Sequence, residues 1–254
     1  MINLRSQAEI ENIAIAGEIV AAAIEKIASL IKEGITTKEL DAEAESFIIK
    51  KGARPAFKGY RGFPAAICAS INEEIVHGIP SNRKLRSGDL ISIDLGVEKE
   101  GFYADAAMTV GVGSIKKDVQ GLIEITQIAL LNGIKKAQIG NRISDVSYCI
   151  QQTVRKAGFD VIREFVGHGI GTKLHEEPPI PNYGELNKGP RIKNGMVLAI
   201  EPMVCEGHWK TEILKDGWTV VTKDRKLSAH FEHTIVVTKN GPRILTLWQK
   251  KKLL

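Results

Sequence analysis

Apolar residues recur at helical spacing in four stretches of the chain. This periodicity predicts four helices, over residues 7–33, 36–52, 116–138 and 143–158. Gly34 is expected to end the first of them, because glycine readily takes the left-handed conformation that ends a helix. The residues from Thr36 to Glu39 form a capping-box sequence, which marks the start of the second helix.

The pattern between the helix pairs is that of β-strands. Residues 90–97 and 102–110 are apolar runs joined by a short polar turn that ends in glycine, which predicts a hairpin. With the fold-back centred just after Lys99, Asp94 faces Asp105. Like charges directly opposite each other are destabilising, so this hairpin needs a compensating cation. The alternative is a bulge that shifts the register and leaves one aspartate exposed.

The order helix, helix, strand pair occurs twice. In each half two glycines bracket a short helix at the same spacing, and a glycine precedes Asp94 at the distance at which another precedes Glu201. The second strand of each pair also carries a carboxylate at an equivalent place. We therefore expect one domain over residues 1–254, with related halves at about 1–113 and 114–254. Chance similarity between ordinary helix–strand segments is the alternative.

A duplicated fold would bring the strand pairs together and make four carboxylates converge, those of Asp94, Asp105, Glu201 and Glu232. Four carboxylates cannot all stay ionised in a half-buried site without cations. Two divalent ions would cancel the charge, as in the two-metal sites of aminopeptidases and phosphatases. Oxygen ligands joined by one imidazole favour manganese, iron or cobalt over calcium.

Histidines that could complete such a site lie in distinctive surroundings. His168 is flanked by glycines within residues 167–171, where the backbone can approach an ion closely. His175 follows shortly afterwards in a His-Glu-Glu-Pro sequence, and His77 precedes a Gly-Ile-Pro sequence. The remaining histidines are predicted to be structural: His208, His230 and His233.

Composition narrows the class of protein. The 254 residues are 43% hydrophobic and carry a formal net charge of +5, and the three cysteines are widely separated, which indicates free thiols in a reducing compartment. No apolar run reaches the roughly 18 residues of a membrane span, and no secretory signal is recognisable. We therefore expect a cytoplasmic protein with no membrane partner. We also expect no DNA partner, because no basic patch with interleaved aromatics is present.

Other enzyme classes are disfavoured by missing motifs. The sequence lacks HExxH, GxSxG, the GxGxxG fingerprint with its following helix, and the P-loop. These absences argue against zincins, α/β-hydrolases, dinucleotide-binding domains and P-loop nucleotidases.

The motifs together closely resemble the type I methionine aminopeptidases over essentially the whole chain. The segments that carry the resemblance are Lys58–Tyr60, Ser70–Pro80, Ile93–Gly96, Tyr103–Asp105, Val166–Gly171, His175–Pro178, Leu198–Met203 and His230–Thr234. The resemblance implies the α+β "pita-bread" fold, with two pseudo-symmetric halves and helices packed outside an antiparallel sheet. It implies removal of the N-terminal methionine from nascent polypeptides with a small second residue.

The resemblance also implies individual roles. Asp94 is expected to chelate one metal ion, Asp105 and Glu232 to bridge both, and His168 and Glu201 to complete the other shell. The implied nucleophile is a hydroxide that bridges the two ions and attacks the methionine carbonyl.

Three side chains are implied to act on the substrate or on protons. Glu201 is the implied proton shuttle, His175 is expected to hydrogen-bond the carbonyl oxygen, and His77 to contact the scissile amide.

By the same resemblance, the methionine side chain enters an apolar pocket formed by Tyr60, Phe63, Cys68 and Trp218. Many relatives carry an aromatic residue where this chain has Leu174, so the width of the pocket is open. A monovalent cation is expected near the backbone of three residues, Asn72, Glu74 and Ser228. We expect a monomer, and the basic composition is compatible with docking on ribosomes.

Three alternatives share the fold. Proline-specific aminopeptidases and prolidases usually carry a large extra N-terminal domain, and type II methionine aminopeptidases carry an insertion in the second half. A binding module that has lost its metal ligands is the third, and it is disfavoured because all five ligand positions are filled here.

Overall fold

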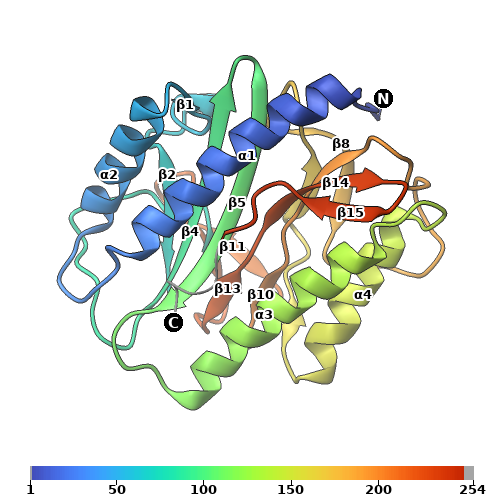
Figure 1. Cartoon of the computed structure of the whole chain (residues 1–254). Coiled ribbons are helices and arrows are strands. Elements are labelled where there is room, and N and C mark those ends of the chain that lie inside the picture. Colours follow the sequence, from blue (N-terminus) through green and yellow to red (C-terminus); the bar gives the residue numbers. More distant parts are fainter. Residues whose placement is uncertain (1, 249–254) are drawn as a thin grey trace.

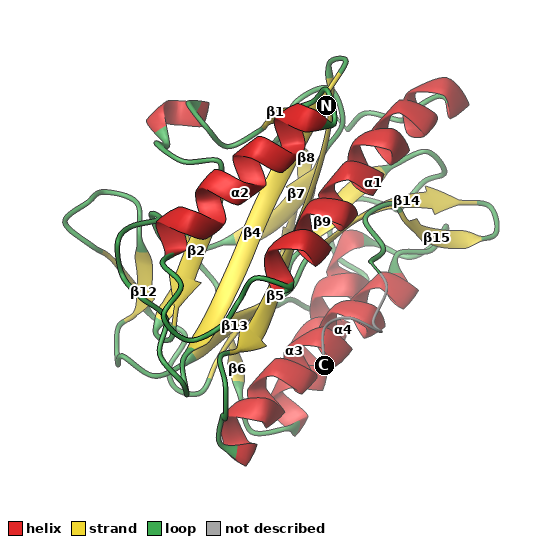
Figure 2. Cartoon of the chain, turned by 60° about the vertical axis from the view of Figure 1, so that its left-hand side comes forward, coloured by secondary structure: helices red, strands yellow, loops and turns green. Residues whose placement is uncertain are grey.

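The structure is a computed structural model that describes residues 2–248. Within these residues two pairs of helices lie outside antiparallel sheets, as expected for the α+β class (Figures 1 and 2). The helices are α1 Gln7–Ala28, α2 Thr37–Lys50, α3 Lys117–Lys136 and α4 Ile143–Lys156, with a short 3₁₀ turn at Tyr60–Gly62. None of the helices described has the length and hydropathy of a membrane span.

Helix α1 ends earlier than predicted. The last helical residue is Ala28, and the predicted continuation to residue 33 is wrong. The reason is local: the Ser29 hydroxyl bonds back to the Lys26 carbonyl at 2.7 Å, and the next residues form tighter turns. The capping box at the start of α2 is confirmed, because the Glu39 carboxylate accepts the Thr36 backbone N–H at 2.8 Å.

The hairpin predicted around the two aspartates is present, but its register differs. β4 Leu90–Lys99 pairs with β5 Phe102–Gly111 so that Asp94 faces Ala107 and Asp105 faces Gly96. The turn is Glu100–Gly101, and both residues have positive φ, 53° and 82°, as a two-residue type I′ turn requires. The turn centre is one residue later than predicted, so every partner moves by two positions. The aspartates are diagonal neighbours on one face, which leaves room between them for a ligand.

The remaining strands complete the sheets. They are β1 Arg54–Pro55, β2 Ile67–Ile71, β3 Glu74–Val76, β6 Asp160–Val161, β7 Val166–Gly169, β8 Glu176–Pro181, β9 Val197–Ile200, β10 Met203–Cys205, β11 Thr211–Ile213, β12 Val220–Thr222, β13 Ser228–His230, β14 His233–Thr238 and β15 Gly241–Ile244. β4 pairs with β1, β2 and β5 in the first half, and the second half holds the order β15-β14-β9-β7-β8.

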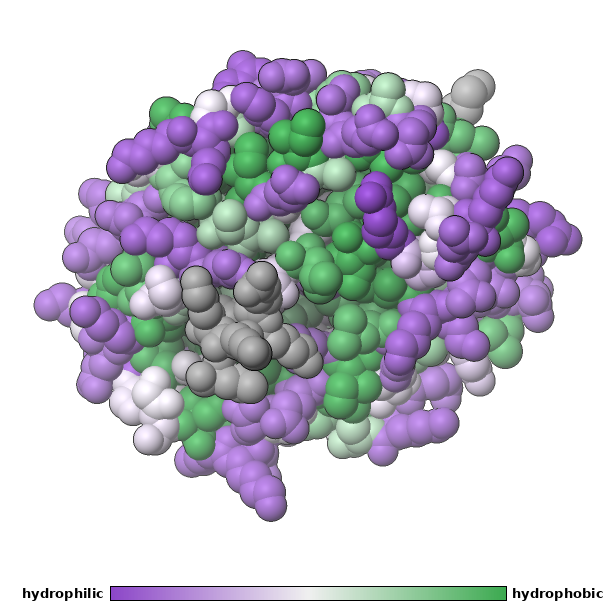
Figure 3. Space-filling view, viewed as in Figure 1, coloured by the Kyte–Doolittle hydropathy of each residue, from purple (hydrophilic) through white to green (hydrophobic). Residues whose placement is uncertain are grey.

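The two halves meet along β5. The backbone N–H of Glu232 donates to the Ala107 carbonyl at 2.9 Å, and that of Asp105 donates to the Thr234 hydroxyl at 3.1 Å. One contiguous apolar core contains side chains from α1, α2, α3 and α4. Charged and polar side chains dominate the rim of the face shown in Figure 3, and apolar side chains gather toward its centre.

An N-terminal arm, residues 2–6, ties α1 to the loop that carries His175. The Arg5 guanidinium forms an ion pair with Glu176 at 2.5 Å, and both side chains are buried, at 7% and 6% exposed. The Glu176 carboxylate also accepts the backbone N–H groups of Thr172 and Lys173, at 2.9 and 3.0 Å. The first residues of the chain therefore hold a loop that lies far along the sequence.

We predict that Arg5→Gln lowers stability because it leaves the Glu176 carboxylate buried without its cation. Breaking one side of a buried pair costs about 3 kcal/mol or more, which for a chain of this size corresponds to a fall in Tm of roughly 6–12 °C. Lys26→Gln is the matched control, since its exposed pair with Glu43 is 3.8 Å long and contributes at most about 1 kcal/mol. Equal melting temperatures for both variants would contradict the prediction.

Candidate metal centre

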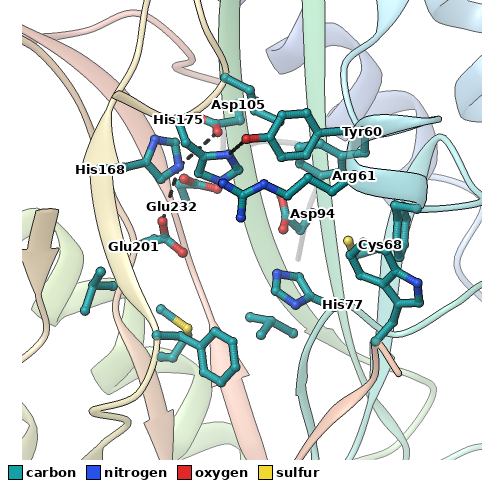
Figure 4. Close-up of a pocket in the computed structure, with 18 residues that line it drawn as sticks. Tyr60, Arg61, Cys68, His77, Asp94, Asp105, His168, His175, Glu201 and Glu232 are labelled. Atoms are coloured by element: carbon teal, nitrogen blue, oxygen red, sulfur yellow. Dashed lines mark hydrogen bonds and ion pairs between the residues drawn. The ribbon is translucent and has the colours of Figure 1, made fainter. Parts of the chain in front are cut away.

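A single pocket collects side chains from both halves of the chain (Figure 4). One end of it is acidic and contains the carboxylates of Asp94, Asp105, Glu201 and Glu232 together with His168. The other end is apolar. The predicted convergence of four carboxylates is therefore what the folded chain contains.

The tightest group in the pocket is made by Asp105, His168 and Glu232. Each offers one ligand atom, and these atoms all lie within 4.8 Å of one another. Glu201 is joined to them through His168, whose Nε2 lies 3.4 Å from Asp105 Oδ2 and 3.5 Å from Glu201 Oε1. Asp94 lines the same pocket from the neighbouring strand β4. All five predicted ligand positions thus face one space, and their metal-binding roles remain predictions.

Backbone and hydroxyl groups fix the orientation of these side chains. The Thr234 hydroxyl lies 3.0 Å from Asp105 Oδ1. The Nδ1 atom of His168 lies 2.9 Å from the Gly169 carbonyl, so this nitrogen carries the proton and Nε2 presents its lone pair to the carboxylates. The glycines beside His168 serve strand packing, since a Cβ at Gly167 would collide with the Ala199 carbonyl.

Burial sets the electrostatics of the cluster. It raises the pKa of Asp94 and of Glu201 to about 8, raises the pKa of Asp105 from its ordinary value, and raises the pKa of Glu232 well above its ordinary value. Asp94 Oδ1 is buried and has no hydrogen-bond partner among the described residues. An unpartnered buried oxygen beside three more carboxylates and an imidazole lone pair is a donor set that fits divalent transition-metal ions.

His175 and His77 line the same pocket as neutral rings. The ring of His175 packs against His168, with centroids 4.3 Å apart. Although the residue as a whole stays exposed, this loss of solvation lowers the pKa of His175 to about 3. Burial lowers the pKa of His77 to about 4. The Tyr60 hydroxyl lies 2.8 Å from His175 Nδ1, so Tyr60 orients this histidine as well as lining the pocket.

The apolar end contains the predicted pocket residues. The Phe63 and Trp218 rings meet edge to face with centroids 5.2 Å apart, and Cys68 belongs to the same cluster. Leu174 is 2% exposed and also lines the pocket. Further lining residues were not predicted as part of the pocket: Phe57, Arg61, Val76, Phe165, Val166 and Met203. Val76, Val166 and Met203 belong to the motif segments, yet no spacing rule assigns them to the pocket.

The three histidines expected to be structural differ from one another. His208 and His233 do not line the pocket, and His233 Nδ1 lies 3.0 Å from the Thr246 hydroxyl. His230 lies closer to the site, with its Nε2 3.6 Å from Glu201 Oε2, and its structural role stays a prediction. Burial lowers its pKa, which keeps this ring neutral.

The residues expected near a monovalent cation lie together beside the pocket. The Ser228 backbone N–H donates to the Asn72 carbonyl at 2.9 Å. The Glu74 carboxylate accepts the Ile71 N–H at 2.8 Å and pairs with Arg83 at 2.9 Å. Cation binding there stays a prediction.

Comparisons with known proteins agree with this site. The sequence model of metallopeptidase family M24 matches residues 11–239. The chain is 50% identical to a methionine aminopeptidase of Clostridium perfringens over 97% of this chain and 99% of that protein. It is 54% identical to methionine aminopeptidase 1 of Bacillus subtilis over 91% and 93% of the two chains.

Solved structures confirm the predicted pita-bread fold. A methionine aminopeptidase from Thermotoga maritima superposes with a TM-score of 0.95 at 45% identity, covering 97% of this chain and 99% of that one. A prolidase from Pyrococcus furiosus superposes with a TM-score of 0.80 at 25% identity, and covers 97% of this chain but 66% of that one. The alternative of a proline-specific peptidase is therefore less well supported.

We predict that metal removal destabilises the protein. At free metal ~100-fold above Kd, one site contributes about 2.7 kcal/mol, so chelation should lower Tm by about 5–10 °C at neutral pH. Asp105→Asn should abolish most of this shift, whereas Asp118→Asn, at an exposed helix start, should preserve it. Equal melting temperatures for chelated and metal-loaded protein would mean that the carboxylates bind no ion tightly.

The metal-free protein should also lose stability as pH rises. Because burial raises the folded-state pKa of Asp94 and Glu201 to about 8, the folded state holds more protons than the unfolded state above pH ~4. That stabilisation is complete below the unfolded pKa and disappears as pH rises through the folded pKa. The gap between metal-free and metal-loaded melting temperatures should therefore widen from pH 5 to pH 8. A gap that narrows over this range would contradict the assignment.

Proposed function

The chain belongs to metallopeptidase family M24, and we propose that it removes the N-terminal methionine from peptides and nascent proteins whose second residue is small. The observation that carries this proposal is one pocket with two unlike ends. The carboxylates and His168 occupy one end, and the apolar cluster of Phe63, Cys68 and Trp218 occupies the other. A substrate with an apolar first side chain can place its carbonyl group against the acidic end.

Methionine suits the apolar end by size and by chemistry. Its thioether is flexible and makes favourable contacts with aromatic ring edges. The Phe63 and Trp218 rings meet edge to face, and Cys68, a small residue of the same cluster, pairs across the sheet with Asp94. The protonated α-amino group of the substrate would be attracted to the carboxylates.

Two divalent ions, manganese, iron or cobalt, would be held by Asp94, Asp105, His168, Glu201 and Glu232. When bound, such ions supply Lewis acidity and lower the pKa of a water molecule toward neutrality. The donor set supports this assignment, because carboxylate oxygens predominate and the single imidazole presents its lone pair to them.

The remaining side chains would orient substrate and move protons. If Tyr60 donates its hydroxyl proton to His175 Nδ1, the proton of the neutral His175 ring stays on Nε2. That N–H can donate to the substrate carbonyl oxygen as negative charge develops there. Neutral His77, which lies on the side of the pocket opposite His175 in Figure 4, would contact the scissile amide. Glu201 would accept a proton and pass it to the leaving nitrogen.

We also propose that the enzyme acts as a monomer in the cytoplasm on chains that leave the ribosome. The net charge of +5 would favour transient attraction to RNA. Co-sedimentation with ribosomes at low salt tests this docking, and its absence there would end the proposal.

Peptide substrates should separate the proposed activity from its relatives. Met-Ala-Ser, Met-Gly and Met-Ser starts should be cleaved, and Met-Lys or Met-Leu starts should resist, because the histidines and carboxylates crowd the space beyond the scissile bond. A prolidase would instead cleave an Xaa-Pro dipeptide that lacks methionine. Chromatography of the released amino acids measures both reactions, through methionine in the first case and proline in the second. Efficient cleavage of Met-Lys peptides would refute the small-residue rule.

Replacement of His175 should separate catalysis from metal binding. We predict that His175→Ala lowers kcat by something like 10²–10³, the range for loss of one oxyanion donor, and leaves the metal content unchanged. Tyr60→Phe keeps the ring and removes the hydroxyl that orients His175, so its fall in kcat should be smaller. A marked loss of metal from His175→Ala, measured by elemental analysis, would show that His175 is itself a ligand.

A further inference from the structure

His230 is a buried histidine whose side chain faces the candidate metal centre. It is 1% exposed, and its Nε2 has no hydrogen-bond partner among the described residues. Among the carboxylates that the structure describes, that of Glu201 approaches it within 4.0 Å, with Oε2 at 3.6 Å, and Asp94 and Asp105 act on the ring electrostatically from farther away. A buried ring nitrogen without a partner is costly in either tautomer, so a group at this position calls for an explanation.

The backbone of His230 is held from both halves of the molecule. Its N–H donates to the Thr109 hydroxyl at 2.8 Å, and the same hydroxyl lies 2.9 Å from its carbonyl oxygen. The Thr109 hydroxyl is itself 2.7 Å from Ser92 on β4, and His230 pairs with Met203 on β10. The ring therefore starts from a backbone with little freedom to move.

Each oxygen of the Glu201 carboxylate lies near a different histidine ring. Oε1 lies 3.5 Å from His168 Nε2, and Oε2 lies 3.6 Å from His230 Nε2. His168 presents a lone pair, because its Nδ1 lies beside the Gly169 carbonyl and carries the proton. A donor is therefore needed only on the Oε2 side, and His230 is the ring that lies there.

We propose that His230 is a positioning residue, which donates from Nε2 to Glu201 Oε2 and thereby fixes the rotation of this carboxylate. Oε1 then stays directed at the space shared with His168. The separation of 3.6 Å exceeds a hydrogen bond, and a small rotation of Glu201 closes it. The role rests on the proposed function, in which Glu201 is a metal ligand and proton carrier. Partners of this kind typically change metal affinity or activity 10–100-fold when removed.

His233 shows what a structural histidine in the same segment looks like. It is 5% exposed, its Nδ1 has the Thr246 hydroxyl as partner, and its ring packs on Trp248 at 4.3 Å between centroids. Within the described part of the chain, its ring has no hydrogen bond, ion pair or ring contact to a residue that lines the pocket. His233 is therefore the matched control for a buried histidine that lies close in sequence but outside the site.

The experiment compares His230→Leu, His230→Gln and His233→Leu. Binding of Mn²⁺ is measured by titration calorimetry. The values of kcat and KM are measured with Met-Ala-Ser, and Tm is measured without metal. His230→Leu should weaken Mn²⁺ binding 10–100-fold and lower kcat at saturating metal while KM changes little. His230→Gln, whose amide N–H can reach Oε2, should recover most of both. His233→Leu should lower Tm and leave Mn²⁺ affinity and kcat unchanged.

A double-mutant cycle tests whether His230 acts on Mn²⁺ binding through Glu201. In a Glu201→Gln background, His230→Leu should change Mn²⁺ affinity by no more than about 2-fold, because its partner is already altered. Equal losses in both backgrounds, or wild-type Mn²⁺ binding and kcat in His230→Leu, would overturn the proposal. If His230→Leu does not fold, His230→Asn takes its place, since its shorter amide cannot reach Oε2. Failure of the wild type to cleave Met-Ala-Ser would refute the proposed function alone, because the Mn²⁺ measurements do not depend on cleavage.

Discussion

Mutual repulsion among four carboxylates in one pocket is the constraint on which the rest of the structure depends. Two like charges about 4 Å apart repel by about 4 kcal/mol at an effective dielectric constant of 20. Several such pairs would cancel most of the roughly 5–15 kcal/mol by which a folded domain is stable. The chain accommodates this either by holding protons, as the raised pKa of Asp94 and Glu201 indicates, or by binding cations. The two solutions compete, so acidity and metal supply act on the same side chains.

The scaffold around the pocket is built to resist that repulsion. Strand β5 contributes Asp105. This strand is hydrogen-bonded across the boundary between the halves to Glu232, Thr234 and His230. The helices outside the sheets contribute side chains to the apolar core, so the stability of the fold does not depend on apolar side chains in the acidic pocket. The N-terminal arm adds a further tie to the loop before His175. Hydrogen bonds therefore hold the backbone segments that carry the carboxylates, and neutral histidines line the edge of the site.

Much of this could be predicted from the sequence, because periodicity and motif spacing depend on local chemistry. The helix starts follow from capping residues such as Thr36, and the carboxylates could be paired through the repeat. The hairpin register could not be fixed, since the sequence allows a two-residue turn at Lys99–Glu100 or at Glu100–Gly101, and the chain adopts the second. Tyr60 beside His175 and His230 beside Glu201 join residues that are remote in sequence, and no spacing rule relates them.

The spread of the candidate site along the chain has a consequence for biosynthesis. The proposed metal-binding and catalytic residues extend from His77 to Glu232, and the loop that carries His175 is held by the ion pair of Arg5 with Glu176. Contacts of such large sequence separation form late and slowly, because loop closure must precede them. Asp94 and Asp105 lie in the first half, but the acidic end of the pocket lacks Glu232 until the segment just before β14 has paired with β5. A chain synthesised only to β13 therefore lacks one member of the tightest group, Glu232, so the candidate metal centre is completed only near the end of translation.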